Sequence, residues 1–349
     1  MIYWILFHAF LVALLILHRN ESNAKRKRIL EFIILFFLVY FSGYRGGLGA
    51  DYENYLHSIE VFTPGVFVFG FSEPLYALLE MIVNITPLSP IFLFLISAFF
   101  TNVGICNYLF KKNEFALFAI LIYVLLPASY TMSFNIVRQF FAVGLFFMSL
   151  RYVGVSFAKY SAFILLATLM HFSAIVLLPF YWLLRIKMSN KKMIAVAAIF
   201  FLVLPIAISF LSGSETRYAE EASSSDVSTS SGVFLVFNLF FLLFITNRNK
   251  YKDLSIINQN LFIWYILMID ASYVNYFFYR LSVYFCPIMA LVIPYLLYKL
   301  DKKNALNSMF IVFLFVLQYY ILLSNVNDST VVPNNIYPIL SIFDSFYES

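Results

Sequence analysis

The chain has 349 residues, of which 62% are hydrophobic and 12% charged, with a formal net charge of +5 and a mean hydropathy of +0.87. About a quarter of the residues of a soluble domain are charged, so this composition excludes a soluble protein. The long apolar runs do not alternate with period two, which favours helices over the strands of a membrane barrel. We therefore predict an all-α polytopic integral membrane protein, with residues 1–349 forming a single transmembrane domain.

Apolar runs long enough to cross a bilayer, or nearly so, follow one another along the chain. They cover residues 2–18, 29–43, 90–110, 115–131, 138–155, 192–211, 233–247, 256–273, 280–299 and 305–324. Together with the ambiguous stretch 158–184, they predict about 11–12 transmembrane or re-entrant helices. The first run has neither a basic region before it nor a small-residue cleavage site after it, which favours a retained span over a signal peptide.

Two longer segments, 44–89 and 212–232, connect these runs. The first is expected to carry an interfacial helix from Glu73 to Ile85. The second begins with charged residues and ends in a Ser-rich tract that has the composition of a linker.

Clusters of basic residues separate the runs and orient the chain, because cytoplasmic loops are rich in Lys and Arg. The clusters are 19–28, 111–114, 185–192, 247–253 and 299–304. Placing them in the cytoplasm puts every lysine inside and most acidic residues outside. Segments 44–89 and 212–232 are then periplasmic, and so are both termini.

The stretch 158–184 has basic residues on both sides, so on this map it enters the membrane and returns, with its turn near His171. Each limb of about 13 residues is roughly 20 Å long at helical rise and cannot cross a core of about 30 Å alone. This predicts a re-entrant hairpin. The alternative makes 73–87 a full span and 158–184 a single pass, but it places Lys111 and Lys159 on the periplasmic side.

Four arginines and no lysine lie on the outer side of this map, and a guanidinium grips phosphate oxygens with a fork that an ammonium lacks. They are Arg45, Arg138, Arg217 and Arg280. Arg138 opens a span, where an ionisable group is by default functional. Each of the others also has a structural reading: Arg45 could pair with an acid of its own loop, Arg217 could be solvated, and Arg280 could anchor a helix end.

Two residues are candidates for a general base. Asp51 follows the glycine-rich "RGGLGA", which lets the backbone approach a ligand, although it could instead be a partner for Arg45. His171 lies at the predicted turn, and an imidazole can exchange a proton near neutral pH, although a lone membrane histidine is more often a packing residue.

Tyrosines gather near the outer ends of the spans, among them Tyr52 and Tyr279. They fit either an interfacial aromatic belt or the rim of a sugar site. The chain lacks DxD and HExxH motifs, and its two cysteines, Cys106 and Cys286, lie inside apolar runs and are expected to pack there. No metal and no other cofactor is therefore predicted.

Four stretches in order, "YRGGLGADYENY", "NIVRQFFAVGLFF", "HFSAIVLLPF" and "NYFFYRLSVYF", resemble the EpsG-like, Wzy-type bacterial polysaccharide polymerases, including O-antigen polymerases. The resemblance covers most of the chain from about residue 40 to 300. It implies a glycosyltransferase of the GT-C type in the bacterial cytoplasmic (inner) membrane. It also places the arginine and aspartate of the family's loop on Arg45 and Asp51, its middle arginine on Arg138, its histidine on His171 and, less securely, an outer-loop arginine on Arg217.

Such enzymes act at the periplasmic face on oligosaccharide repeat units carried by undecaprenyl diphosphate, as in lipopolysaccharide biosynthesis. The growing chain leaves its lipid diphosphate and joins a hydroxyl of the incoming unit. The partners implied are the lipid-linked donor and acceptor, membrane lipid and a chain-length regulator protein, with no nucleic acid. The remaining alternatives are a flippase for the same lipid-linked sugar, an O-antigen ligase-like transferase and a structural subunit of an export complex.

Overall fold

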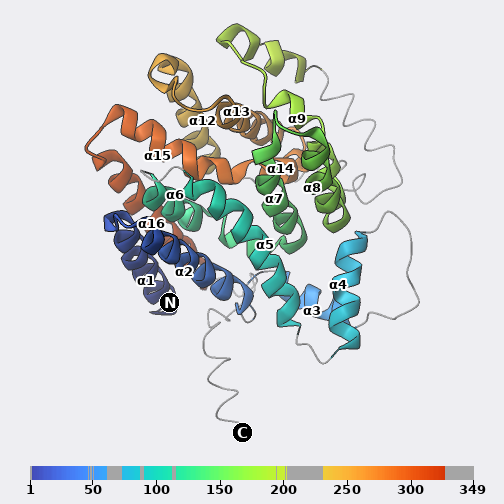
Figure 1. The fold of residues 1–349 in the computed structure, drawn as a ribbon. Coiled ribbons are helices and arrows are strands. Elements are labelled where there is room, and N and C mark those ends of the chain that lie inside the picture. Colours follow the sequence, from blue (N-terminus) through green and yellow to red (C-terminus); the bar gives the residue numbers. More distant parts are fainter. Residues whose placement is uncertain are drawn as a thin grey trace.

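In the computed structural model, every regular element is a helix throughout the described part of the chain, as Figure 1 shows. The described residues are 2–45, 47, 49, 51–60, 73–86, 90–111, 115–193, 195–200, 202 and 231–326. The all-α prediction is therefore confirmed for these ranges. Arg217 and most of segment 212–232 lie outside them.

The longer helices fall largely on the predicted apolar runs. They are α1 (Ile2–Asn20), α2 (Ala24–Gly43), α5 (Ile91–Phe110), α6 (Ala116–Leu125), α7 (Val137–Ser149), α8 (Phe157–Met170), α12 (Ser231–Thr246), α13 (Ile256–Ala271), α15 (Met289–Leu300) and α16 (Ala305–Val326). Shorter helices connect them: α3 (Tyr52–Glu60), α4 (Pro74–Ile85), α9 (Phe180–Leu183), α14 (Tyr276–Val283) and the 3₁₀ turns η1 (Thr131–Phe134), η3 (Phe172–Leu177) and η5 (Cys286–Ile288). The helix expected from Glu73 to Ile85 is present as α4, whereas α3 was not anticipated.

Few of these helices have the full length of a span. In the described residues only α5 is both long and apolar enough to cross a membrane, and α14 with α15 would do so as one bent pair with a 48° angle. Seven other apolar helices are shorter. The run 280–299 was predicted as one element, but Pro287 lies in the 3₁₀ turn between α14 and α15, where its missing N–H suits a break. Similarly, Pro127 follows the end of α6.

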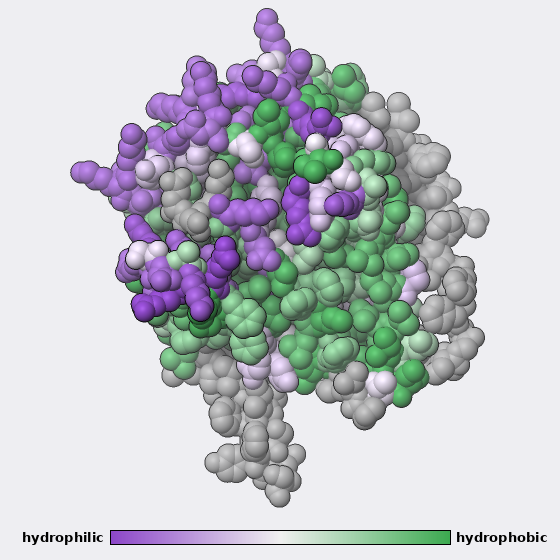
Figure 2. Space-filling view, viewed as in Figure 1, coloured by the Kyte–Doolittle hydropathy of each residue, from purple (hydrophilic) through white to green (hydrophobic). Residues whose placement is uncertain are grey.

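The described basic clusters gather at one end of the molecule, where Figure 2 shows hydrophilic side chains above an apolar surface. Their contacts join segments that are far apart in sequence. Arg19 lies over the Phe118 ring, Lys299 Nζ donates to Asp253 Oδ2 at 2.7 Å, and Arg248 Nη1 donates to Asn190 Oδ1 at 2.8 Å. The prediction that these loops share one side is therefore confirmed.

The chain reverses at His171, where an extended residue (φ −152°, ψ 112°) separates α8 from η3. The Tyr160 hydroxyl donates to Leu177 O at 2.6 Å, and the rings of Phe157 and Trp182 are 4.7 Å apart, so the two limbs run side by side. The reversal of the chain predicted near His171 is therefore present. The alternative that exported Lys111 is wrong, because the last turn of α5 packs against the ring of His18 in the same end of the molecule as the first basic cluster.

Helices α5 and α7 cross closely at two glycines. A Cβ on Gly104 would collide with the backbone of Gly144, and a Cβ on Gly144 would collide with the backbone of Phe100. Small residues let membrane helices approach in this way, since lipid gives them no hydrophobic incentive to associate. The crossing fixes α7, whose first turn carries Arg138, against α5.

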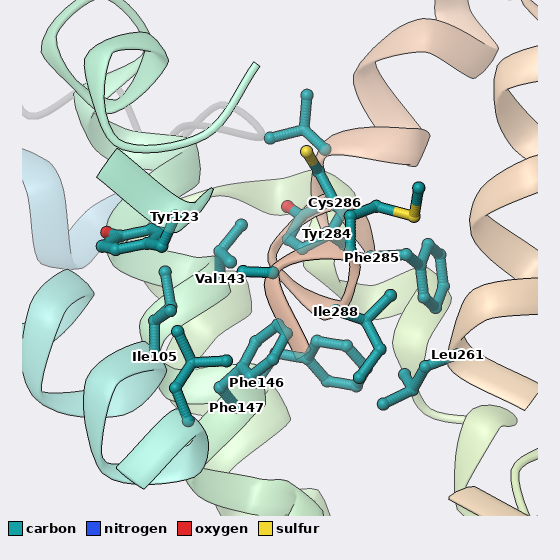
Figure 3. Close-up of a cluster of buried hydrophobic side chains, with 14 of the residues drawn as sticks. Ile105, Tyr123, Val143, Phe146, Phe147, Leu261, Tyr284, Phe285, Cys286 and Ile288 are labelled. Carbon is teal, nitrogen blue, oxygen red and sulfur yellow. The ribbon is translucent and has the colours of Figure 1, made fainter. Parts of the chain in front are cut away.

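The core lies between α5, α6, α7, α13 and the α14–η5 turn, as the close-up in Figure 3 shows. Fully buried aromatic rings fill it, including Tyr123, Phe146 and Tyr284. Cys106 and Cys286 are both free and buried there, and Cys286 Sγ donates to Ala128 O at 3.2 Å. Their predicted role in packing is confirmed.

Candidate active site

The glycine-rich loop after α2 folds onto the η1 turn. Gly47 and Gly49 adopt positive φ values of 73° and 112°, which other residues rarely adopt. A Cβ on Gly49 would lie 2.7 Å from Phe134 O. Glycine is therefore required at position 49 both for the turn and for the close approach of the loop to η1.

Arg45 is buried beneath this loop, with only 2% of its surface exposed. Its guanidinium carbon lies 4.4 Å from the centre of the Phe94 ring and 5.5 Å from that of Phe134. Burial lowers the pKa of Arg45 to about 10, so it stays charged at neutral pH. Nε and Nη2 have no hydrogen-bond partner, and in the described residues no acid forms an ion pair with Arg45, so the pairing with its own loop is not seen.

Asp51 directly precedes α3, and Tyr52 is the first residue of that helix. Asp51 Oδ1 accepts a hydrogen bond of 3.4 Å from Asn54 Nδ2, and the Tyr52 ring stacks on Phe94 at 4.9 Å. The Tyr52 ring therefore contributes to the packing of α3 onto α5.

Arg138, in the first turn of α7, reaches a carboxylate that the sequence analysis did not select. Its Nη1 donates to Glu73 Oε2 at 2.5 Å, and the guanidinium lies 4.9 Å from the centre of the Tyr76 ring. It also interacts with the Tyr55 hydroxyl on α3. With 28% of its side chain exposed, Arg138 keeps some N–H groups accessible.

His171 contacts the same carboxylate from the hairpin turn. Its Nδ1 hydrogen-bonds to Glu73 Oε1, so the two oxygens of Glu73 are divided between an imidazole and a guanidinium. Burial alone would raise the pKa of Glu73, but the hydrogen bond from His171 and the charge of Arg138 hold that pKa below its ordinary value. We call Glu73, Arg138 and His171 the Glu73 cluster.

The Glu73 cluster joins three segments that are distant in sequence. Glu73 precedes α4, Arg138 opens α7, and His171 separates α8 from η3. Since Nδ1 of His171 is occupied by Glu73, Nε2 is the ring nitrogen that can meet a substrate. A carboxylate that holds an imidazole in one tautomer is the arrangement that supports general base chemistry.

Arg280 lies in the same part of the fold, because its backbone carbonyl bonds to the residue next to Arg138. Gln139 Nε2, next to Arg138, donates to Arg280 O at 2.5 Å. Ser173, two residues after His171, hydrogen-bonds to the Tyr284 hydroxyl at 2.8 Å. The turn of the hairpin and the start of α7 are therefore both tied to α14 and its end, which also carries Tyr279 as a partly buried residue packed against the core.

The predicted residues thus divide into groups. Arg138 and His171 meet at Glu73, Arg280 lies on the neighbouring α14, and Arg45 with Asp51 belongs to the loop below α3. In the described parts of the chain no group of three His, Cys, Asp or Glu side chains could hold a metal ion. Glu73 was missed because its only sequence signal was an acid before a proline at the start of a predicted interfacial helix.

The structure defines a helical membrane protein with a guanidinium, a carboxylate and an imidazole gathered at the end away from its basic loops. The EpsG family model matches residues 28–338, and the chain belongs to the EpsG family. This confirms the predicted resemblance and identifies a polysaccharide polymerase-like membrane protein. No curated protein and no solved structure matches the chain.

Proposed function

We propose that this protein is a membrane glycosyltransferase that polymerises oligosaccharide units linked to undecaprenyl diphosphate into O-antigen or a related surface polysaccharide. The Glu73 cluster is the observation that carries the proposal, because it combines a cation suited to phosphate with an oriented base. The reaction takes place at the periplasmic face of the inner membrane, within a helical GT-C-like fold.

In this proposal the donor is the growing chain on its lipid diphosphate. The bond between the reducing-end sugar carbon and the diphosphate oxygen breaks, and its electron pair stays on the departing diphosphate. Arg138 stabilises that negative charge through the N–H groups that Glu73 does not occupy, and Arg280 and Arg217 are the further candidates. The activated donor supplies the energy.

The acceptor is a sugar hydroxyl of the incoming lipid-linked unit. Its oxygen bonds to the sugar carbon as its proton passes to Nε2 of His171, while Glu73 fixes the imidazole and stabilises its positive charge. Asp51 was the other candidate for the base. Its described contact with Asn54 gives it no comparable partner, so we assign the proton to His171.

Arg45 has a positioning role in this scheme. It is sandwiched between aromatic rings below α3, and α3 supplies the Tyr55 that meets Arg138. Tyr52 and Tyr279 remain candidates for the rim along which sugar rings stack.

The proposal is tested by deleting the gene in its host and complementing with Arg138→Ala, His171→Ala or the native gene. Surface polysaccharide is then separated on a gel. Loss of a polymerase leaves a single repeat unit on the lipid core, whereas loss of a flippase or a ligase leaves bare core. Bare core, or long polymer in both variants, would rule out the assignment.

A further inference from the structure

A second site lies at the basic end of the molecule. A cleft of about 890 Å³ opens between the segment after α9 and the turn that joins α12 to α13. Its lining includes five cationic side chains and no acidic one: Lys187, Lys192, Arg248, Lys250 and Lys252. The four lysines that line it are exposed.

Arg248 builds the floor of this cleft. It spans from the α12–α13 turn to the opposite wall, where its guanidinium donates to Met188 O and to Asn190 Oδ1, the latter at 2.8 Å. Burial lowers the pKa of Arg248. These hydrogen bonds join the two walls of the cleft.

Apolar surface continues from the cleft along α12. Ile245 and Ile256 line the cleft itself, and Leu242, Leu239 and Leu235 follow along the helix with 58%, 55% and 58% of their surface exposed. A soluble anion would use the cations alone. A lipid would use both parts, with its headgroup among the lysines and its acyl chains along α12.

We propose that this cleft binds the headgroup of a doubly charged anionic phospholipid from the adjacent leaflet. Basic pockets between membrane helices suit headgroups that carry two phosphates, because several cations can contact both. The volume is in the range of small-molecule sites. The site is separate from the Glu73 cluster, which lies at the other end of α5 and α7, so it does not depend on the proposed reaction.

The test compares two variants that lose the same charge at the same end of the protein. Lys250→Ala/Lys252→Ala removes two cleft lysines, and Lys302→Ala/Lys303→Ala removes two exposed lysines of the α15–α16 turn. The full-length protein is reconstituted in phosphatidylcholine vesicles with cardiolipin, or with phosphatidylglycerol at matched total charge. Lipid that stays bound after detergent extraction is counted by native mass spectrometry.

We expect cardiolipin to be retained by the native protein and by Lys302→Ala/Lys303→Ala. The cleft variant should bind it about 25-fold more weakly, since each cation near an anionic headgroup contributes roughly a factor of five. Equal losses in both variants, or equal retention of phosphatidylglycerol, would overturn the proposal. Displacement of bound cardiolipin by inorganic pyrophosphate would also overturn it, because the site would then recognise a soluble phosphate.

Discussion

Replacing Glu73 by Gln should disable the candidate active site while leaving the fold in place. Gln has the same shape and can still accept a hydrogen bond, but it removes the negative charge between Arg138 and His171. The variant therefore leaves a guanidinium without its counter-charge and an imidazole without the group that orients it. Both proposed roles of the cluster are affected at once.

The size of the effect follows from the geometry of the pair. Two unit charges 2.5 Å apart attract by roughly 7 kcal/mol at an effective dielectric constant of about 20, before desolvation is subtracted. The Arg138 side chain is 28% exposed and that of Glu73 12%, so water screens part of this attraction. Breaking a buried pair costs about 3–5 kcal/mol, and we take the lower end. If the variant loses about 3 kcal/mol of transition-state stabilisation, the rate falls roughly 150-fold.

The assay is the polymer ladder of the complemented deletion strain, with protein level measured in the membrane fraction. Glu80→Gln is the matched control, because Glu80 is a buried acid within α4, close in sequence to Glu73, and accepts a hydrogen bond from Ser58 instead. We expect Glu73→Gln to leave a single repeat unit on the core and Glu80→Gln to make polymer. Long polymer from Glu73→Gln at normal protein level, or equal loss in both variants, would refute the reasoning.

Four further outcomes are expected. Arg138→Lys should reduce polymer at least tenfold at unchanged protein level, since lysine cannot hold Glu73 and a diphosphate with one planar fork. Arg45→Met should keep the melting temperature of the purified protein within about 4 °C of the native value, because a buried cation with no ion pair among the described residues is replaced by an apolar chain of similar length. Gly144→Ala should lower thermal stability by about 1–3 kcal/mol through overpacking of α5 on α7, measured by heat-induced aggregation in detergent. The pKa of Glu73 is lower in the folded protein than its ordinary value of 4.5. Its charge therefore stabilises the fold above pH 4.5, and this stabilisation is lost as the pH falls through the pKa of the folded state. The difference in melting temperature between the native protein and Glu73→Gln should shrink over that interval.

The sequence was sufficient for most of the helices and for the common side of the basic loops. Both follow from terms that act locally: apolar runs long enough to be helical in lipid, and positive charge in the connecting loops. The hairpin at His171 could be inferred as well, because the alternative topology would have placed Lys111 and Lys159 on the periplasmic side. Breaks at Pro127 and Pro287 were visible in the sequence but were not used.

The residues that form the candidate site were harder to predict from the sequence. Arg138 was selected because an ionisable group is costly near a bilayer, and His171 because it lies at the predicted turn and can exchange a proton near neutral pH. Neither reason depends on contacts with other segments. Glu73 acquires its importance only from the contacts between α4, α7 and α8, and no spacing in the sequence records them. The burial of Arg45 was equally hidden, since it depends on Phe94 and Phe134 from two other segments closing around it.

Helix ends explain why the Glu73 cluster can hold its charges. Glu73 occupies the N-cap position of α4, without a side-chain cap hydrogen bond, and His171 follows the C-terminus of α8. Each helix dipole therefore favours the charge that the proposed mechanism needs there. Arg138 is the exception, because it lies at the positive end of α7 and adds a second positive charge to it. That end therefore attracts anions strongly. Glu73 pairs with this guanidinium in the structure, and in the proposed reaction the diphosphate would contact the N–H groups of Arg138 that Glu73 leaves unoccupied.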